Sequence, residues 1–386
     1  MPTHSGHSLE AGILSRAREW VDVAPWIRLG RVMRLAGSPV AVGLVIVAGV
    51  IWHSVLSAVS GESTAAALFE GQVTGTEILR APGDWSPWLA PLGLVRQVLW
   101  NLNPMVLFWA DGTDNSKAGW MRVLSGIGIW SWTALVWTPV VLFLCRQGAL
   151  LTTRRDLMGT SGVMRLAIHR TPRAWLSMLT PLACVLVLLV PVIAFSWSFH
   201  VAVDRILGPS SFLGGFLAML AAVVLIPAGV LAMGSFVALP SAFAALINEP
   251  HPDSLDALSR GYENLLRRPL SLVFYVAMAL ACVFVAGNLA RGVSVCAANL
   301  ADSVNVGPAP LQAVGQENPD LESSYSATLT RLLQFFPACV AFALSWGMVG
   351  GTYLLLRRDC GGQEVEDLWI PERKSTTELP ELPRPN

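Results

Sequence analysis

Six apolar runs, each about as long as a helix that crosses a lipid bilayer, constrain the fold of this chain more than any other feature. A transmembrane helix needs about 20 consecutive, predominantly apolar residues. Runs of this kind occupy approximately residues 38–60, 121–145, 174–199, 212–237, 269–291 and 332–356. Only 13% of the residues are charged, whereas about 25% are charged in soluble domains. The sequence therefore predicts an all-α polytopic membrane protein, built as a bundle of six transmembrane helices.

The apolar runs divide the chain into three parts. Residues 1–37 contain several arginines together with Trp20 and Trp26, a pattern typical of a cytoplasmic segment with an amphipathic helix on the membrane surface. Residues 38–356 form the six-helix membrane domain, and residues 357–386 form a polar cytoplasmic tail. The first run is too long and too far from the N-terminus for an ordinary cleaved signal peptide, so we expect it to remain as an anchor.

Two apolar stretches are interrupted by prolines. The run from Phe212 to Ile247 is much longer than one span, and Pro227 and Pro240 divide it. We therefore expect a span over 212–237, followed by a bent or interfacial segment. The stretch Trp88–Trp109 is broken by prolines and by a charge, which predicts an aromatic-rich piece at the outer headgroup level rather than a span.

A basic block, Cys145–Trp175, lies between the second and third apolar runs and carries six arginines against one acid, Asp156. Basic residues concentrate in the cytoplasmic loops of membrane proteins. Most of the 26 basic residues fall in the segments that are inside if both termini are inside. The sequence therefore predicts a multi-pass protein of a cytoplasmic membrane, with both termini in the cytoplasm.

The pentapeptide VMRLA occurs twice, at 32–36 and 163–167, each time shortly before a proline and an apolar run. An amphipathic pattern over Ser254–Arg268 stands in the same relation to Pro269 and the fifth run. These positions predict three repeats of one unit: an amphipathic interfacial helix followed by a helix hairpin. A chance identity of five residues is the alternative.

Three segments resemble an uncharacterised family of bacterial six-span integral membrane proteins. They are CRQGALLTTRRDLMGTSGVMRLAIHRTPRAWLSMLTPL (145–182), DALSRGYENLLRRPLSLVFY (256–275) and GTYLLLRRDCGGQEVEDLW (351–369). The pattern of an amphipathic helix before each span is also distantly similar to the membrane domain that accompanies some glycerophosphodiester phosphodiesterases. The resemblance implies six helices in a bacterial cytoplasmic (inner) membrane. The family has no established activity, so it implies no catalytic residue.

Signatures of a reaction are missing from the sequence. No Asp or Glu lies inside the six predicted spans, which argues against a proton-coupled carrier, and His53 is the one ionisable residue well inside a span. His200 and Asp204 could share a helix face, but two ligands do not make a zinc site. Metalloprotease, hydrolase and nucleotide-binding motifs do not occur. We therefore expect no catalytic, metal or cofactor site, and a net charge of zero predicts no nucleic-acid partner.

Arginines next to the predicted spans are the candidate functional residues. Each basic residue near the inner leaflet contributes about 1 kcal/mol to binding anionic lipid. The candidates for contact with lipid headgroups are Arg154, Arg155, Arg165, Arg170, Arg173, Arg267 and Arg268. The alternative is that these arginines only set the topology.

Three further patterns make predictions about packing. Gly347, Gly350 and Gly351 predict close helix packing within the bundle rather than dimerisation. An acidic segment, 364–367 beside Trp369, is more often solvated, although it could dock on the basic block or on a partner. Cys296 and Cys339 could form a disulfide, but a cysteine in an apolar run is more often a small hydrophobe.

The function that these observations favour is a non-enzymatic membrane component, a scaffold or accessory subunit. It would contact anionic lipid of the inner leaflet and a protein partner or a second copy of itself. The alternative is a transporter or permease-like component for an apolar or lipidic solute. An intramembrane enzyme is a third hypothesis, and it requires polar side chains that converge at one depth.

Overall fold

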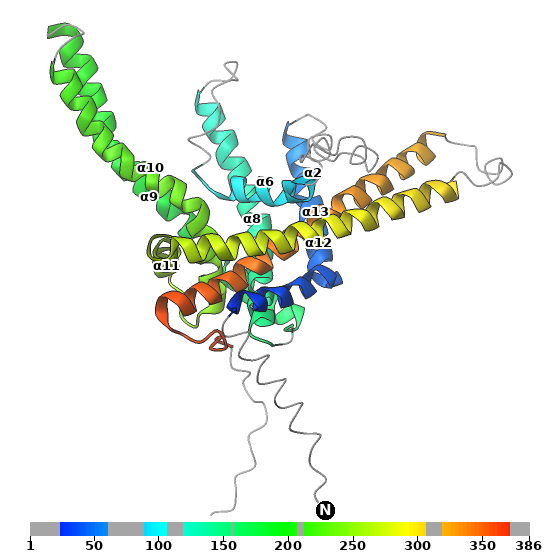
Figure 1. The fold of residues 1–386 in the computed structure, drawn as a ribbon. Helices are drawn as coiled ribbons and strands as arrows, with labels where there is room; N and C mark the ends of the chain where they lie inside the picture. The colour runs from blue at the N-terminus through cyan, green and yellow to red at the C-terminus, as the bar shows by residue number, and fades with distance from the viewer. Residues whose placement is uncertain are drawn as a thin grey trace, which may run out of the picture.

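The computed structural model describes residues 24–60, 89–105, 119–155, 157–206, 212–305 and 319–370, and every regular element in these ranges is a helix (Figure 1). The elements are η1 (Pro25–Gly37), α2 (Pro39–Ser60), η2 (Ala90–Leu92), α6 (Gly93–Leu102), α8 (Gly119–Thr152), α9 (Thr160–Ile206), α10 (Phe212–Asn248), α11 (Ser254–Arg267), α12 (Pro269–Asn305) and α13 (Pro319–Gly361). Six of these helices, α2, α8, α9, α10, α12 and α13, are long and apolar enough to cross a membrane. The predicted all-α, multi-pass membrane architecture is therefore confirmed.

The long helices diverge from a shared base (Figure 1). α9 and α10 form one extended hairpin, α12 and α13 form another, and α2 and α8 rise between them. At the base lie η1, α11 and the segment that follows α13. We call this base the basic end; its described residues are η1, 146–155, 157–173, 246–268 and 353–370.

α13 lies at the centre of the assembly. In its apolar window 89% of the residues are buried, compared with 17% in those of α9 and α10. The α9–α10 hairpin instead exposes large apolar side chains such as Val187, Ile193 and Ile226. Lipid tails are as apolar as these side chains, so a bilayer covers them without cost.

Glycines allow α8 and α13 to touch backbone to backbone. A Cβ atom on Gly148 would lie 1.9 Å from the carbonyl oxygen of Gly347, and one on Gly350 would lie 2.0 Å from that of Cys145. η1 packs on the same surface, because a Cβ on Gly347 would lie 2.5 Å from Leu35 Cδ2. The prediction that the glycines of the sixth span pack within the bundle is confirmed.

The structure differs from the expected boundaries where helices continue through polar or proline-containing sequence. α10 is one helix as far as Asn248, with Pro227 and Pro240 inside it, so residues 238–248 continue the helix of the span rather than forming a separate segment. Proline is tolerated there because neighbouring groups satisfy the freed backbone in membrane helices. α8 continues to Thr152 and α9 begins at Thr160, so most of the basic block is helical.

The turn between α8 and α9 is tight. Arg154 has a φ of 63°, and the amide of Arg155 donates to the carbonyl of Leu150 at 3.0 Å, which is a Schellman-type helix end. This turn places the end of α8 and the start of α9 together at the basic end.

α6 does not span. Its ten residues extend about 15 Å. Its apolar face, Leu94, Val98 and Leu102, is buried. It packs against α8 and α13. Residues 88 and 106–109, at the two ends of the Trp88–Trp109 stretch, lie outside the described residues.

The first three residues of the two VMRLA copies share their exposure, while the last two differ: Leu35 is buried in the first copy and Ala167 in the second. Val32 and Val163 are buried, whereas Arg34 and Arg165 are exposed. The first copy lies in η1, before the proline that starts α2, while the second lies in the first turns of α9, which runs on into its span. The arrangement therefore supports a repeated unit whose surface helix is fused to the span in its second copy.

The glycine contact makes a testable prediction. We expect Gly350→Ala to destabilise the protein by about 1–3 kcal/mol, because the new Cβ meets a backbone carbonyl that cannot move aside. Gly292→Ala on α12 is the matched control, since nothing lies within 4 Å of the added Cβ. Thermal unfolding in detergent measures both. Equal melting temperatures for the two variants would show that α8 and α13 do not cross at these glycines.

Candidate functional site at the basic end

A buried carboxylate, Glu249, lies where α10 ends. Its Oε1 accepts hydrogen bonds from the Tyr353 hydroxyl on α13 and from the Arg260 guanidinium on α11. Arg260 also pairs with Asp256 at 3.0 Å. Glu249 therefore ties α11 and α13 to the end of α10.

The groups around Arg260 stabilise its charged form. Burial acts to lower its pKa, but the carboxylate of Glu249, the Tyr353 hydroxyl and Asp256 more than compensate and raise the pKa above its usual value. Arg31 on η1 shows the opposite effect: burial first, and then repulsion from Arg154 and Arg28, lower its pKa. The basic end thus contains Arg260, which is paired with acidic side chains, and Arg31, which is repelled by neighbouring arginines.

Arg146 on α8 is fully buried. Its guanidinium donates to Asn248 Oδ1 at 3.1 Å and to the carbonyl of Trp369 at 2.5 Å. Both acceptors are neutral, and the Nε of Arg146 has no hydrogen-bond partner. Within the described parts of the chain, no carboxylate lies at ion-pair distance from this guanidinium.

Arg170 on α9 is also buried and takes backbone carbonyls as its partners. It donates to the carbonyl of Leu246, to that of Glu249 at 2.7 Å and to that of Pro250 at 3.4 Å. These acceptors are the unpaired carbonyls that the end of a helix leaves free. Arg170 thereby caps α10 and holds the α9–α10 hairpin at its base.

The Trp369 ring covers both buried arginines. Its centroid lies 4.7 Å from Arg170 Cζ and 6.0 Å from Arg146 Cζ. Both distances are within the range in which a cation is attracted to an aromatic face.

The segment that carries this ring, residues 362–370, docks on the basic end. Val365 and Leu368 are buried in the main apolar core. Glu366 pairs with Arg28 at 2.7 Å, and Arg357 donates to the carbonyl of Asp367 at 2.6 Å. The acidic side chains Glu364, Glu366 and Asp367 are exposed, as expected of a solvated run, while the segment that carries them docks on the basic block through its backbone and Trp369. Residues 371–386 of the tail lie outside the described residues.

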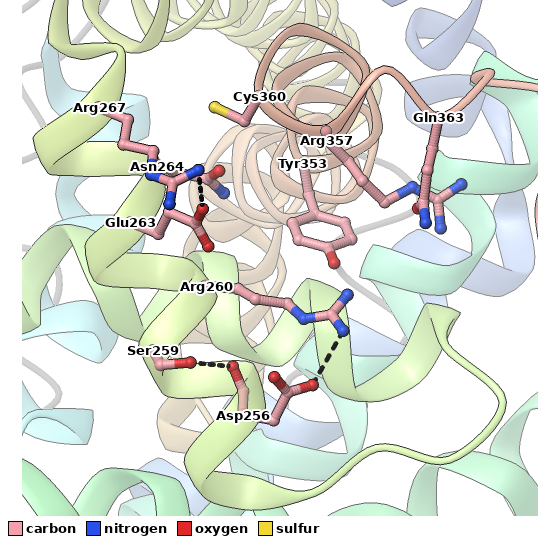
Figure 2. A pocket seen from close by; sticks show the side chains of 11 residues that line it. Asp256, Ser259, Arg260, Glu263, Asn264, Arg267, Tyr353, Arg357, Cys360 and Gln363 are labelled. Carbon is pink, nitrogen blue, oxygen red and sulfur yellow. Dashed lines mark hydrogen bonds and ion pairs between the residues drawn. The ribbon is translucent and has the colours of Figure 1, made fainter.

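Figure 2 shows a polar cavity of about 350 Å³ between α11 and the end of α13. Its charged lining consists of Asp256, Arg260, Glu263, Arg267 and Arg357. Both carboxylates are already paired with arginines of the lining, Glu263 with Arg267 at 2.7 Å. A second cavity, of about 470 Å³, lies beside Arg173 and the turn 250–253.

The predicted lipid-contacting arginines separate into two groups. Six are exposed at the basic end: Arg154, Arg155, Arg165, Arg173, Arg267 and Arg268. The seventh, Arg170, is buried, and its guanidinium is occupied by protein carbonyls. The predicted set therefore mixes a surface group with an internal helix cap.

Other candidates from the sequence have simpler environments. All six cysteines are free, including Cys296 and Cys339. His53 on α2 is half-buried, and its Nε2 has no hydrogen-bond partner. The side chains of His200 and Asp204 lie outside what the structure describes. In the described ranges, no three His, Cys, Asp or Glu side chains are grouped to hold a metal ion.

Glu249, Tyr353 and Asn248 were missed by the sequence reasoning. Glu249 follows the apolar run of α10 directly and therefore looks like a loop residue. One feature of the sequence indicates that Glu249 is buried: the apolar run continues to Ile247. The buried helix therefore ends directly before this acid.

No protein-family model, curated protein or solved structure matches the chain. The six-helix membrane architecture is therefore established from the structure, while membership of the bacterial six-span family stays a prediction.

The buried pair makes a prediction about stability. We expect Glu249→Gln to destabilise the protein by about 2 kcal/mol, since it weakens hydrogen bonds to a charged group in a buried place. Glu263→Gln, which removes an exposed pair within one helix, is the control and should cost about 0.5 kcal/mol or less. Chemical or thermal unfolding in detergent measures the difference. A loss as large for Glu263→Gln as for Glu249→Gln would contradict the distinction between the two pairs.

Proposed function

We propose that the protein is a non-enzymatic membrane component that binds anionic phospholipid headgroups at its basic end. The observation that carries this proposal is the gathering of six exposed arginines at one end of a six-helix membrane assembly. They come from the α8–α9 turn, from α9 and from the junction of α11 and α12.

Two further features support a lipid surface as the ligand. Large apolar side chains are exposed close to these arginines, among them Leu266 at 70% and Leu270 at 85%. An amphipathic surface with arginines beside apolar side chains is the arrangement that lies in the headgroup region of a bilayer. The basic end accordingly faces the cytoplasm, where anionic lipids and the positive-inside rule both favour it.

The alternative, transport of an apolar or lipidic solute, lacks a comparable observation. Both cavities described above lie at the basic end and are lined mainly by charged or polar residues. The transport hypothesis and the search for a protein partner or a homo-oligomer therefore stay predictions.

The lipid proposal is tested with arginines whose side chains bond to nothing else in the described structure. Arg154, Arg165 and Arg268 are exposed and donate no side-chain hydrogen bond there. At about 1 kcal/mol each, the triple Gln variant should lose roughly two orders of magnitude in affinity for phosphatidylglycerol at low salt. Native mass spectrometry of protein from mixed phosphatidylglycerol and phosphatidylcholine nanodiscs measures the preference.

Arg96→Gln on α6, an exposed arginine away from the basic end, is the matched control. It should leave the preference unchanged. If the triple variant retains phosphatidylglycerol as well as the wild type does, the exposed arginines do not bind lipid.

Orientation is tested separately. A C-terminal green fluorescent protein fusion should fluoresce, and a C-terminal alkaline phosphatase fusion should be inactive, because both tags would be cytoplasmic in a bacterial host. An active phosphatase fusion would place the basic end outside and remove the inner-leaflet lipid from the proposal.

A further inference from the structure

Arg146 and Arg170 are two buried cations that lie against the same Trp369 ring, and neither forms a salt bridge among the described residues. The charges of Arg170 and Arg155 repel that of Arg146, whereas Arg170 is repelled by Arg173 and attracted by Glu249. Glu249 is the nearby acid, but its carboxylate already accepts from Arg260 and Tyr353. Burying a charge that lacks a partner of opposite sign costs several kcal/mol. Such an arrangement is typical of a site that binds a charged ligand.

An aromatic ring, that of Trp369, rather than an acidic side chain contacts both guanidinium groups. The carbonyl of Trp369 also accepts a hydrogen bond from Arg146. A cation–aromatic contact contributes about 0.5–2 kcal/mol. A phosphate group, by contrast, forms charge-assisted, two-pronged hydrogen bonds with arginine, which are about twice as strong as neutral ones. The Nε–H of Arg146 has no acceptor in the described structure, so it is free to donate to a phosphate oxygen.

The segment that carries Trp369 is attached in a way that allows it to leave. α13 ends at Gly361, and Gly362 adopts a φ of 67°, a left-handed conformation in which glycine is free of strain. Beyond it, residues 363–370 form no helix and are held by a few anchors, chiefly Val365, Glu366 and Leu368. Arg357 on α13 also donates to the carbonyls of Glu364 and Asp367, so movement at Gly362 would break these two hydrogen bonds together with the other anchors and would leave the α13 backbone in place.

We propose that Arg146 and Arg170 form a binding site for a phosphate group, and that residues 362–370 close this site by placing Trp369 over it. Phosphate is the chemistry that two neighbouring guanidinium groups recognise best. It can come from the headgroup of a phospholipid or from a soluble phosphate. The site is distinct from the exposed arginines of the proposed function and does not depend on them.

The test uses the full-length protein in phosphatidylcholine nanodiscs and compares the wild type with Trp369→Ala. One arm titrates inorganic phosphate, and the other incorporates increasing fractions of phosphatidic acid. We expect Trp369→Ala to bind one of these ligands at least tenfold more tightly than the wild type, because the ring no longer competes. Binding of phosphatidic acid alone identifies a lipid ligand, and binding of inorganic phosphate identifies a soluble one.

Two controls test whether the gain in phosphate affinity depends on the buried arginines. Trp197→Ala, on the exposed part of the α9–α10 hairpin, removes a tryptophan of 71% exposure and should change neither affinity. Adding Arg170→Lys to Trp369→Ala keeps the charge but removes the two-pronged donor, and should abolish most of the gain. The triple variant at Arg154, Arg165 and Arg268 should retain the gain, so this proposal and the proposed function can fail separately.

A second variant tests the proposal in case Trp369→Ala fails to fold. Glu366→Gln weakens the pair with Arg28 and leaves Arg146, Arg170 and Trp369 in place. It should raise the affinity for the same ligand severalfold, because it loosens the closing segment. If neither Trp369→Ala nor Glu366→Gln binds either ligand more tightly than the wild type, the proposal is wrong.

Discussion

The contact between α8 and α13 is the interaction on which the rest of the structure depends. The two backbones meet where Gly148 faces Gly347 and where Cys145 faces Gly350. No apolar driving force brings helices together within lipid, so close packing at small residues must supply the attraction. Because Arg146 follows Cys145 directly, this packing carries its side chain into the protein. Tyr353, less than one turn beyond Gly350, is carried in from the other helix in the same way.

Once these side chains are buried, their polar groups decide how the remaining helices attach. A buried polar group must find a partner or cost several kcal/mol. Arg146 donates a hydrogen bond to Asn248, and Tyr353 donates one to Glu249. Arg170 donates to the carbonyls at the end of α10. All of these partners lie within a few residues of one helix end. The α9–α10 hairpin is therefore fixed at its base and left to lipid along its length, which explains why it is the least buried part of the assembly.

The sequence predicts the spans and the packing glycines because both follow from local composition. Long apolar runs require helices in a membrane, and Gly347 and Gly350 stand out in such a run. It does not predict which basic residues are buried: Arg165 and Arg170 lie on one helix in one basic block, yet one is exposed and the other is inside. The same holds for the segment around Trp369, whose docking depends on a surface formed by α8, α9 and η1. Helical spacing does place Arg170 on the face of Val163 and Ala167, but the period alone does not show that this face meets protein rather than lipid or water.

Under the predicted repeat, the two copies of the pentapeptide differ in the residues that follow them at the basic end. Aligning VMRLA in η1 with VMRLA in α9 places Arg34 opposite Arg165, and both are exposed. The same alignment places Pro39, the first residue of α2, opposite Arg170. The first copy therefore has no arginine at the position of Arg170; the buried arginine of η1, Arg28, lies before the pentapeptide and pairs with Glu366. Since Arg146 also lies at the joint between the first and second units, the buried pair arises once in the chain, at that joint, and is not repeated with the units around it.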